Sequence, residues 1–442
     1  MRPLHFSFGL RGPARPSPWM PRAVLWLLCG ATMLAWQLVV AVPAQARPGD
    51  LDRGFGMGGT VTTDFAGGPD EARALVMQGR KLVAAGSAFN SETSDDFGLV
   101  RYDANGALDR SFGTGGKVTT NIIGSISPDE ANALIQQADG KLVAAGRTLG
   151  PIGGFDFALT RYSANGALDP SFGTGGILST DIAGRSDNAR ALIQQADGKL
   201  VVAGGTDTDT GSDFALARYN PDGTLDSGFG TSGTVTTDLA VFNIDEANAL
   251  IRLADGKLVA AGFAVGPAGS FDFAVVRYNP DGTLDQSFGT GGAVTTDIVG
   301  GDEFARALAV QADGKLVAAG VANTQTGASV ALARYHPDGT LDPSFGTGGT
   351  VTTGLDRAFA LVVQADGKLV AAGVAGQDFG LARYHPNGTP DPSFGTGGRV
   401  TTDFAGDSDF AQALAVQADG KLVAAGVAGP VGDFALARYR TR

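Results

Sequence analysis

Residues 364–373, QADGKLVAAG, decide the fold, because this stretch or a close variant occurs seven times in the 442 residues. Its centre, Asp366-Gly367, is a pair that tolerates the positive φ of a tight turn, and an apolar run lies on each side. The stretch therefore predicts a β-hairpin. The hairpin lysines are Lys81, Lys141, Lys199, Lys257, Lys315, Lys368 and Lys421, with spacings of 60, 58, 58, 58, 53 and 53 residues.

Each repeat contains four segments with the composition of β-strands. In the copy that begins at Asp302 we expect strands at 305–311, 315–321, 330–335 and 350–353. A period this long with four strands is typical of a propeller blade, and no segment sustains the 3.6-residue stripe of a helical repeat. Both faces of the inner strands are apolar or small, so each sheet must be covered on both sides. The sequence predicts an all-β fold, a seven-bladed β-propeller of four-stranded antiparallel blades, formed by residues 47–442 as one domain.

The two ends of the repeat region are incomplete blades that complement each other. Residues 51–63 hold a third-to-fourth turn and a fourth strand, whereas 434–439 are a third strand. We therefore expect Val61, Thr62 and Thr63 to pair antiparallel with the last strand. Such pairing closes the ring without a disulfide.

Three recurring phrases, FxLxRY, DGxLDxSFGxGG and ADGKLVAAG, resemble the delta-60 repeat, a bacterial propeller-type repeat usually found in exported proteins. The resemblance covers about residues 51–440. Departures are local: Gln78-Gly79-Arg80 replaces Ala-Asp-Gly, Ser329-Val330 replaces Asp-Phe, and the loop at 354–356 is short. The family has no general biochemical assignment, so the resemblance implies a fold and export but no activity.

Residues 1–46 differ from the repeats and have the features of a secretory signal peptide. Arg11, Arg15 and Arg22 precede an apolar run at 23–42, and Ala44-Gln45-Ala46 is a small-x-small cleavage site. A transmembrane anchor is the alternative, although the run is of marginal length. Met1 and Met20 are both candidate starts, and a chain that begins at Met20 has a signal of ordinary length. Cys29 lacks the small preceding residue of a lipoprotein signal. We expect a protein secreted to the periplasm, the cell surface or the medium.

The charge of the mature chain limits the partners. Residues 1–46 contain four arginines and no acidic residue, so 29 basic and 45 acidic side chains remain and the formal charge is near −16. Such a field repels nucleic acid and anionic membranes, and we expect neither as a partner, nor membrane insertion after cleavage. The sole cysteine also leaves with residues 1–46, which excludes disulfides and thiolate chemistry. We expect a monomer.

Four motifs suggest chemistry but have simpler structural interpretations. The glycine-rich residues 113–117 lack the Ser or Thr of a phosphate loop and predict a turn into an outer strand. His336 and His385 occupy slots that hold asparagine in other copies, ahead of proline, and predict turn residues. Residues 207–213 have alternating carboxylates but lack the downstream Glu of a calcium loop, and predict a solvated acidic loop. We therefore expect no catalytic, cofactor-binding or metal-binding residue from these motifs, and no cofactor.

An Arg-Tyr pair ends the third strand of every copy. We expect it to pack between blades, with the arginine meeting the aspartate of the following Leu-Asp phrase, as Asp285 follows Arg277. An aromatic binding ring is the alternative. The tyrosines are Tyr102, Tyr162, Tyr219, Tyr278, Tyr335, Tyr384 and Tyr439.

A polar ring near the propeller axis is the candidate site. Each first strand has one side chain directly ahead of an Ala-Leu pair, and these should lie at equal height, with Phe359 breaking the ring in the sixth copy. We expect nearby aspartates such as Asp187 and Asp245 to face or pair with it. The six polar members are Arg73, Asn132, Arg190, Asn248, Arg306 and Gln412.

The loops of the repeat divide into a constant and a variable set. First-to-second and third-to-fourth turns are nearly identical between copies, whereas second-to-third and fourth-to-first loops vary and lie together on what we call the variable face. A rigid scaffold with one variable face is typical of binding, although loops also drift without function. We expect a binding or scaffold protein for a protein or polysaccharide. The alternative is a propeller hydrolase or lyase with an acidic, possibly calcium-dependent site near the channel.

Overall fold

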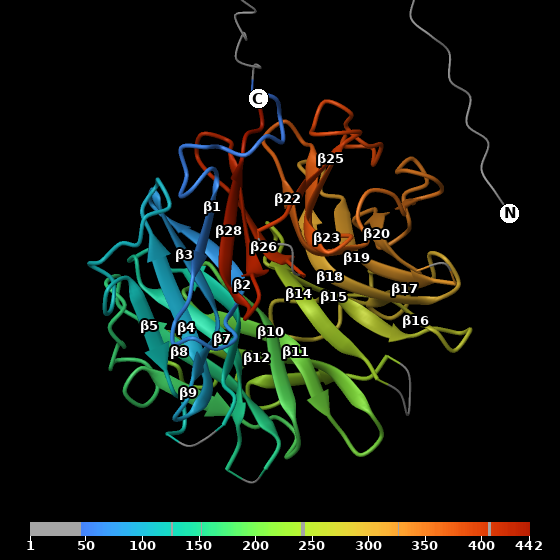
Figure 1. The fold of residues 1–442 in the computed structure, drawn as a ribbon. Coiled ribbons are helices and arrows are strands. Elements are labelled where there is room, and N and C mark those ends of the chain that lie inside the picture. The colour runs from blue at the N-terminus through green and yellow to red at the C-terminus, as the bar shows by residue number, and fades with distance from the viewer. Residues whose placement is uncertain (1–45, 125–126, 152, 240–243, 326, 405–407) are drawn as a thin grey trace, which may run out of the picture. The chain divides into compact units, whose positions relative to one another are not determined.

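The computed structural model describes residues 46–442 except 125–126, 152, 240–243, 326 and 405–407. The predicted signal peptide lies, apart from Ala46, outside the described residues. Residues 46–442 form one compact unit of seven four-stranded antiparallel sheets arranged around a common centre (Figure 1). This confirms the predicted seven-bladed propeller. Within the described ranges, no helix is long and apolar enough to cross a membrane.

The first strands lie innermost, because neighbouring blades touch through them around the ring. They are β2 (Glu71–Gln78), β6 (Glu130–Gln136), β10 (Asp187–Gln194), β14 (Glu246–Arg252), β18 (Asp302–Val310), β22 (Arg357–Val363) and β26 (Phe410–Val416). The second strands are β3 (Lys81–Asn90), β7 (Leu142–Leu149), β11 (Leu200–Asp207), β15 (Leu258–Val265), β19 (Leu316–Thr324), β23 (Leu369–Ala375) and β27 (Leu422–Ala428).

The third and fourth strands form the outer half of each blade. The third strands are β4 (Ser94–Tyr102), β8 (Phe155–Tyr162), β12 (Ser212–Tyr219), β16 (Phe271–Tyr278), β20 (Gly327–Tyr335), β24 (Asp378–Tyr384) and β28 (Asp433–Tyr439). The outermost strands are β1 (Thr60–Thr63), β5 (Lys117–Thr120), β9 (Ile177–Thr180), β13 (Thr234–Thr237), β17 (Ala293–Thr296), β21 (Thr350–Val351) and β25 (Arg399–Thr402).

Two local departures in the repeat have structural consequences. The first copy is one residue shorter at its hairpin, so Gln78 pairs directly with Lys81 across a two-residue turn, Gly79-Arg80. The fourth strand expected at 350–353 keeps only two residues in β21. Where the chain enters its shortened loop, Thr353 O accepts a hydrogen bond of 2.5 Å from the Tyr384 hydroxyl.

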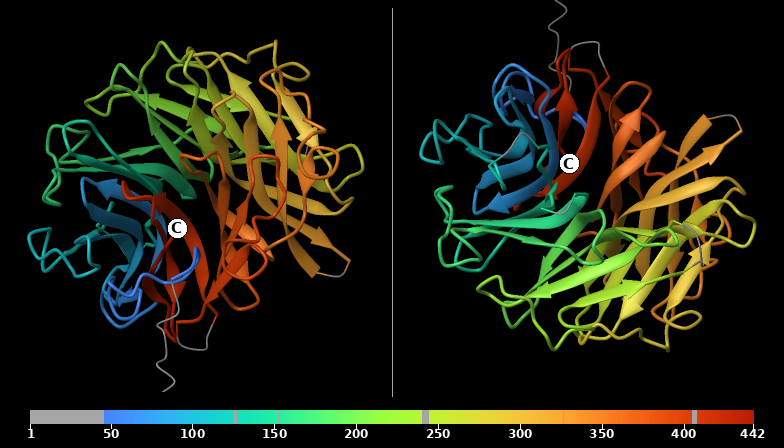
Figure 2. Two further views of the ribbon diagram at one scale, coloured as in Figure 1. Left: turned by 90° about the horizontal axis from the view of Figure 1, so that it is seen from above. Right: turned by 90° about the horizontal axis from the view of Figure 1, so that it is seen from below.

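The N-terminal strand closes the ring. β1 pairs antiparallel with β28, with Val61 opposite Leu436 and Thr63 opposite Phe434. Figure 2 shows the blue N-terminal segment against the red C-terminal blade. The third-to-fourth turn is completed by both termini, since Gly49 N donates to Arg440 O and Arg440 N donates to Asp50 O, at 2.8 and 2.9 Å. The predicted closure is confirmed.

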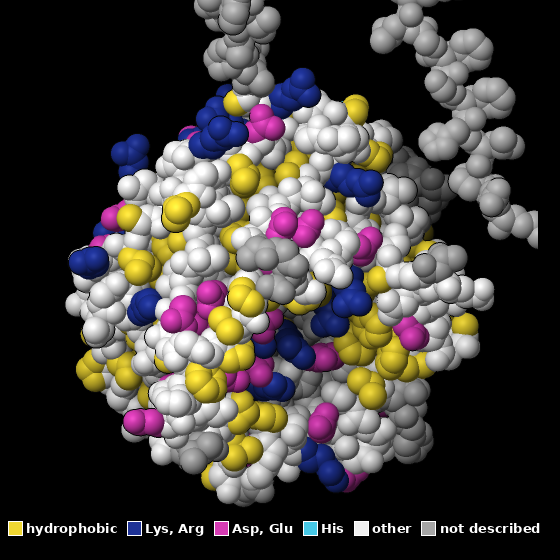
Figure 3. Space-filling model, in the orientation of Figure 1, with side chains coloured by type: hydrophobic (Ala, Val, Ile, Leu, Met, Phe, Trp, Pro, Cys, Tyr) yellow, Lys and Arg dark blue, Asp and Glu magenta, His cyan; other side chains and the backbone are white. Residues whose placement is uncertain are grey.

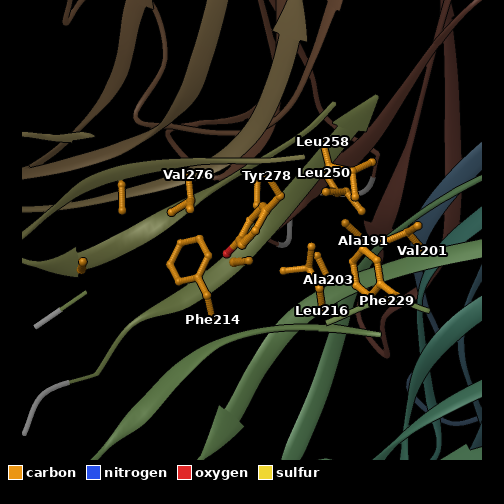
Figure 4. Packing of buried hydrophobic residues seen from close by; sticks show 14 residues of the cluster. Ala191, Val201, Ala203, Phe214, Leu216, Phe229, Leu250, Leu258, Val276 and Tyr278 are labelled. Atoms are coloured by element: carbon orange, nitrogen blue, oxygen red, sulfur yellow. The ribbon is translucent and has the colours of Figure 1, made fainter. Parts of the chain in front are cut away.

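The Arg-Tyr pairs hold neighbouring blades together, as expected. The tyrosines are at most 1% exposed, and the Tyr278 hydroxyl donates to Thr237 Oγ1 of the preceding blade at 3.0 Å. Figure 4 shows Tyr278 directed toward Phe214 of that blade. Arg277 Nε donates to Asp285 Oδ2 at 2.7 Å, its guanidinium lies over the Phe288 ring, and Nη1 donates to Pro337 O of the next blade.

This buried arginine–aspartate pair recurs in all seven blades. The aspartates are Asp52, Asp109, Asp169, Asp226, Asp285, Asp342 and Asp391. Burial acts to raise the pKa of Asp285, but hydrogen bonds from Lys257 and Ser287 outweigh it and hold that pKa below its ordinary value. The pKa of each of the six other aspartates is likewise lowered.

We expect the stability of the fold to be greatest near pH 4 and to fall between about pH 4 and pH 6. The seven lowered aspartates stabilise the fold above their unfolded pKa, about 3.9, and this contribution is lost as the pH falls through their folded values. Burial raises the pKa of Asp70, Asp129 and Asp187 to about 6, so their contribution is instead lost as the pH rises through 6. Urea unfolding in chelator-containing buffers from pH 3 to 8 measures this, and a stability that rises steadily to pH 8 contradicts it.

Candidate functional site

A β-bulge in every first strand sets the position of the predicted ring. In β2 the pairing with β3 shifts register between Ala72 and Ala74, so Arg73 is the extra residue, and the six other first strands bulge at the equivalent position. The glycine of LVAAG lies opposite the bulge. A Cβ on Gly86 would lie 1.7 Å from Glu71 O, and only glycine avoids this clash because it has no Cβ. The bulge re-aims one side chain per blade, and a mid-strand glycine was its only sequence signal.

The structure brings all six predicted ring residues and Phe359 to one cavity of about 500 Å³. They follow directly on the fourth-to-first loops, so the cavity lies toward the variable face. Figure 3 shows basic and acidic side chains around the hollow at the centre of one face. Sequence reasoning missed three further lining residues: Glu71, Glu130 and Arg147.

Hydrogen bonds link the ring from blade to blade. Arg73 binds Glu71 through Nη2 at 2.6 Å, and its Nη1 also reaches Asn132 Oδ1 at 2.9 Å and the Glu130 carboxylate. Asn132 Nδ2 donates to Ala189 O at 2.8 Å, and Asn248 Nδ2 donates to Ala305 O at 2.9 Å. Each amide thus bonds the backbone at the bulge of the next blade, which fixes the ring's geometry.

The carboxylates that pair with the ring are glutamates, and the expectation for Asp187 and Asp245 is wrong. Arg190 Nε donates to Glu246 Oε1 at 2.7 Å. Asp187 and Asp245 instead cap loops, where they accept backbone hydrogen bonds from Ile182 and Leu239 at 2.7 and 2.8 Å. Glu71, Glu130 and Glu246 lie two residues before a ring position, on the same face of the strand, and so come within reach of the arginines.

Arg306 differs from the other arginines of the cavity. Its Nη1 donates to Asn248 Oδ1 at 3.2 Å, whereas its buried Nε has no hydrogen-bond acceptor, and no carboxylate of the described residues lies within ion-pair distance. Burial, with Arg190 and Arg357 nearby, lowers the pKa of Arg306. The cavity therefore contains an arginine that forms no ion pair with the described residues, although Glu246 is near enough to act against the lowering of its pKa.

The residues of the other candidate motifs lie in turns or at the ends of strands. Gly113, Gly115 and Gly116 have φ of 49°, 66° and 102° and form the turn into β5. His336 and His385 are half-exposed in equivalent turns. Their Nε2 atoms lie 3.7 Å from Asp342 and 4.0 Å from Asp391, respectively. In residues 207–213, Asp207 ends β11 and is exposed, whereas Asp213 lies in β12.

Solved structures with a similar fold are only distantly related. The WD40 β-propeller domain of Doa1 is 11% identical, with a TM-score of 0.48 over 87% of this chain and 98% of that chain. The polysaccharide lyase Uly1 is 12% identical, with a TM-score of 0.45 over 86% and 92%. Sqt1 of Chaetomium thermophilum, bound to the N-terminus of ribosomal protein L10, is 13% identical, with a TM-score of 0.46 over 82% and 84%. No curated protein sequence matches.

One family model matches the repeats directly, and its description is "Domain of unknown function (DUF5122) beta-propeller". The matched segments are residues 80–112, 137–172, 195–229, 247–288, 311–345, 364–394 and 417–441, one in each copy. Together they cover more than half of the chain, and the chain therefore belongs to the DUF5122 β-propeller family.

Proposed function

We propose that this chain is an exported binding protein whose ligand presents a carboxylate to the cavity at the centre of the variable face. Arg11, Arg15, Arg22 and the apolar run at 23–42 support export. The three recurring phrases support the narrower assignment to the delta-60 repeat, and with it a bacterial source. A monomer agrees with the ring closed on itself by β1 and β28.

The observation that carries this proposal is the Arg306 side chain. Four arginines and two glutamates line the cavity, so it is locally positive in a chain of formal charge −12. A half-buried guanidinium without an ion-pair partner carries a desolvation cost, and a ligand carboxylate between Arg190 and Arg306 would supply that partner.

The remaining lining residues favour an acidic polysaccharide as the source of the carboxylate. Asn132, Asn248 and Gln412 offer amide groups for hydroxyls, and Phe359 offers an apolar surface in an otherwise polar cavity. The variable loops surround the cavity and add contacts along an extended chain. A protein partner on these loops is the second candidate, and the test below distinguishes it.

A hydrolase or lyase fits the geometry less well. General acid catalysis needs a carboxyl that is protonated near neutral pH. Burial acts to raise the pKa of Glu130, but Arg73 and Arg147 outweigh it and lower that pKa overall. Glu71 also forms an ion pair with Arg73, at 2.6 Å.

We expect the purified protein to bind an oligogalacturonate and to ignore a neutral galacto-oligosaccharide of equal length. Replacing Arg306 by Gln removes one charge-assisted contact, worth about 1.5–3 kcal/mol, and should weaken binding by about 10- to 100-fold. Isothermal titration calorimetry measures both affinities.

Arg110→Gln is the matched control, because Arg110 is exposed in a third-to-fourth segment on the opposite face. It removes the same charge and should leave the affinity within about twofold, by the small effect of distant exposed charges. Equal affinity for the charged and neutral sugars, or equal loss in both variants, contradicts the proposal. Binding of a protein from the same source that is insensitive to Arg306→Gln would favour the second candidate.

A further inference from the structure

Clusters of three carboxylates recur at the edge of the variable face, outside the central cavity. Each combines an acid near the start of a third strand, one directly after a fourth strand, and one at the beginning of the next first strand. In each cluster one oxygen per residue lies within 4.8 Å of the others. The five clusters are Asp64, Asp70 and Asp433; Asp156, Asp181 and Asp187; Asp213, Asp238 and Asp245; Asp272, Asp297 and Glu303; Asp378, Asp403 and Asp409.

The cluster of Asp156, Asp181 and Asp187 is the clearest, because two of its members are almost fully buried. Asp156 is 2% exposed and Asp187 is 0% exposed. Asp187 accepts a hydrogen bond from the backbone N–H of Ile182 at 2.7 Å, and Asp181 accepts one from the backbone N–H of Gly184 at 2.5 Å. No lysine or arginine of the described residues forms an ion pair with any of the three, although Arg185 follows closely and pairs with the exposed Asp209.

Asp156 supplies an independent sign that something is bound there. Its buried Oδ1 has no hydrogen-bond donor among the described residues. A Cβ on Gly150 would lie 2.3 Å from this oxygen, so the loop passes the carboxylate as closely as a glycine allows. A buried carboxylate oxygen without a hydrogen-bond donor is costly in the ionised form, and a bound cation would stabilise it.

The spacing of the oxygens suits a hard divalent cation. Calcium binds carboxylate oxygens at about 2.4 Å, so two ligands on opposite sides of the ion lie about 4.8 Å apart. Three carboxylates from different strands, together with water or backbone carbonyls, form the irregular oxygen-rich coordination that calcium accepts. Magnesium requires a regular octahedron and usually keeps several of its waters, so three carboxylates from different strands suit it less well.

Two blade junctions lack the full set of three acids, and that of β4, β5 and β6 has Asp96, Asn121 and Asp129. At the positions equivalent to the cluster, the junction of β20, β21 and β22 has Ser329 and Gly354, and keeps only Asp356. These are the same residues that mark the fifth and sixth copies as irregular in sequence.

We propose that Asp156, Asp181 and Asp187 bind a divalent cation, calcium being the best fit, and that the four equivalent clusters do the same. The cations tie the start of each third strand to the following fourth-to-first loop. They therefore order the loops of the variable face, whatever ligand that face binds. The sequence led us to expect no metal, because each cluster joins residues that no local motif connects.

Calcium binding by the full chain tests this directly. After removal of metals with a chelator, equilibrium dialysis against calcium chloride should give five bound ions per chain, one for each cluster. Asp181→Asn should reduce the number by one, and Asp181→Asn with Asp297→Asn by two. Asp181 is exposed and an Asn oxygen can still accept the Gly184 hydrogen bond, so we expect these variants to fold.

The matched control is Asp197→Asn. Asp197 is exposed in a hairpin turn on the face opposite the variable face, and it accepts a hydrogen bond from the backbone N–H of Lys199. It should leave the number of bound ions unchanged. Calcium should also raise the melting midpoint of the parent chain, and raise that of the double variant less. Binding of magnesium at the same sites with lower affinity supports the proposal. No bound calcium at millimolar concentration, or a number of ions that the Asp181→Asn variant leaves unchanged, would overturn it.

Discussion

Deleting residues 51–64 should prevent the chain from folding to a stable monomer. The deletion removes β1 and bares the edge of β28, an apolar strand poor in charge and able to pair with other chains. It also removes Phe55, which is 0% exposed, and Asp52, which pairs with buried Arg438 at 2.9 Å. Losing a buried Phe costs about 3–5 kcal/mol and leaving a buried arginine unpaired about as much, which together approach the whole stability of a typical domain.

A circular permutant keeps β1 but joins it covalently to β28, so it separates the effect of losing the strand from the effect of changing how the strand is connected. The turn hydrogen bonds between Gly49, Asp50 and Arg440 match those of the continuous turn at Asn220, Gly223 and Thr224. A chain that begins at residue 66 and in which residue 47 directly follows residue 440 should therefore keep the melting midpoint of the parent. Size-exclusion chromatography and calorimetry measure both variants. A deleted chain that stays monomeric with the parent's midpoint would show that β1 does not hold the ring closed.

The second large effect is expected at the buried arginine–aspartate pair. Replacing Asp285 by Ala leaves Arg277, which is 6% exposed, without its carboxylate, and should lower the free energy of unfolding by about 3–5 kcal/mol. The same carboxylate also accepts hydrogen bonds from the Ser287 amide and hydroxyl, at 3.1 and 2.7 Å, so the turn loses its cap. Urea unfolding with a two-state or blade-wise fit measures the change.

Lys257→Met is the matched control for this pair. Lys257 donates to the same aspartate at 2.7 Å but is 28% exposed, and half-exposed ion pairs contribute at most about 1 kcal/mol. Adding Arg277→Met to Asp285→Ala removes the unpaired charge and should restore part of the loss. Equal costs for Asp285→Ala and Lys257→Met would mean that the buried pair does not stabilise the blade junction.

The sequence determined the features that repeat or lie close together in the chain. The period, the hairpin turns and the apolar faces of LVAAG and FALAR predicted the blade and the number of blades, because they follow from backbone geometry and burial. The incomplete blades at the two ends predicted the pairing of β1 with β28. The separation of Arg277 and Asp285 by eight residues predicted their contact, which the structure places at 2.7 Å.

Only the tertiary structure decided which side chains meet across blades. The register shift at each first strand adds one residue to the pairing, and this sets which carboxylates, Glu71, Glu130 and Glu246, reach the ring in place of Asp187 and Asp245. Asp156, Asp181 and Asp187 come from a third strand, the end of a fourth strand and the next blade. Their convergence depends on how one blade packs on the next, and no local pattern of polar and apolar residues encodes that packing.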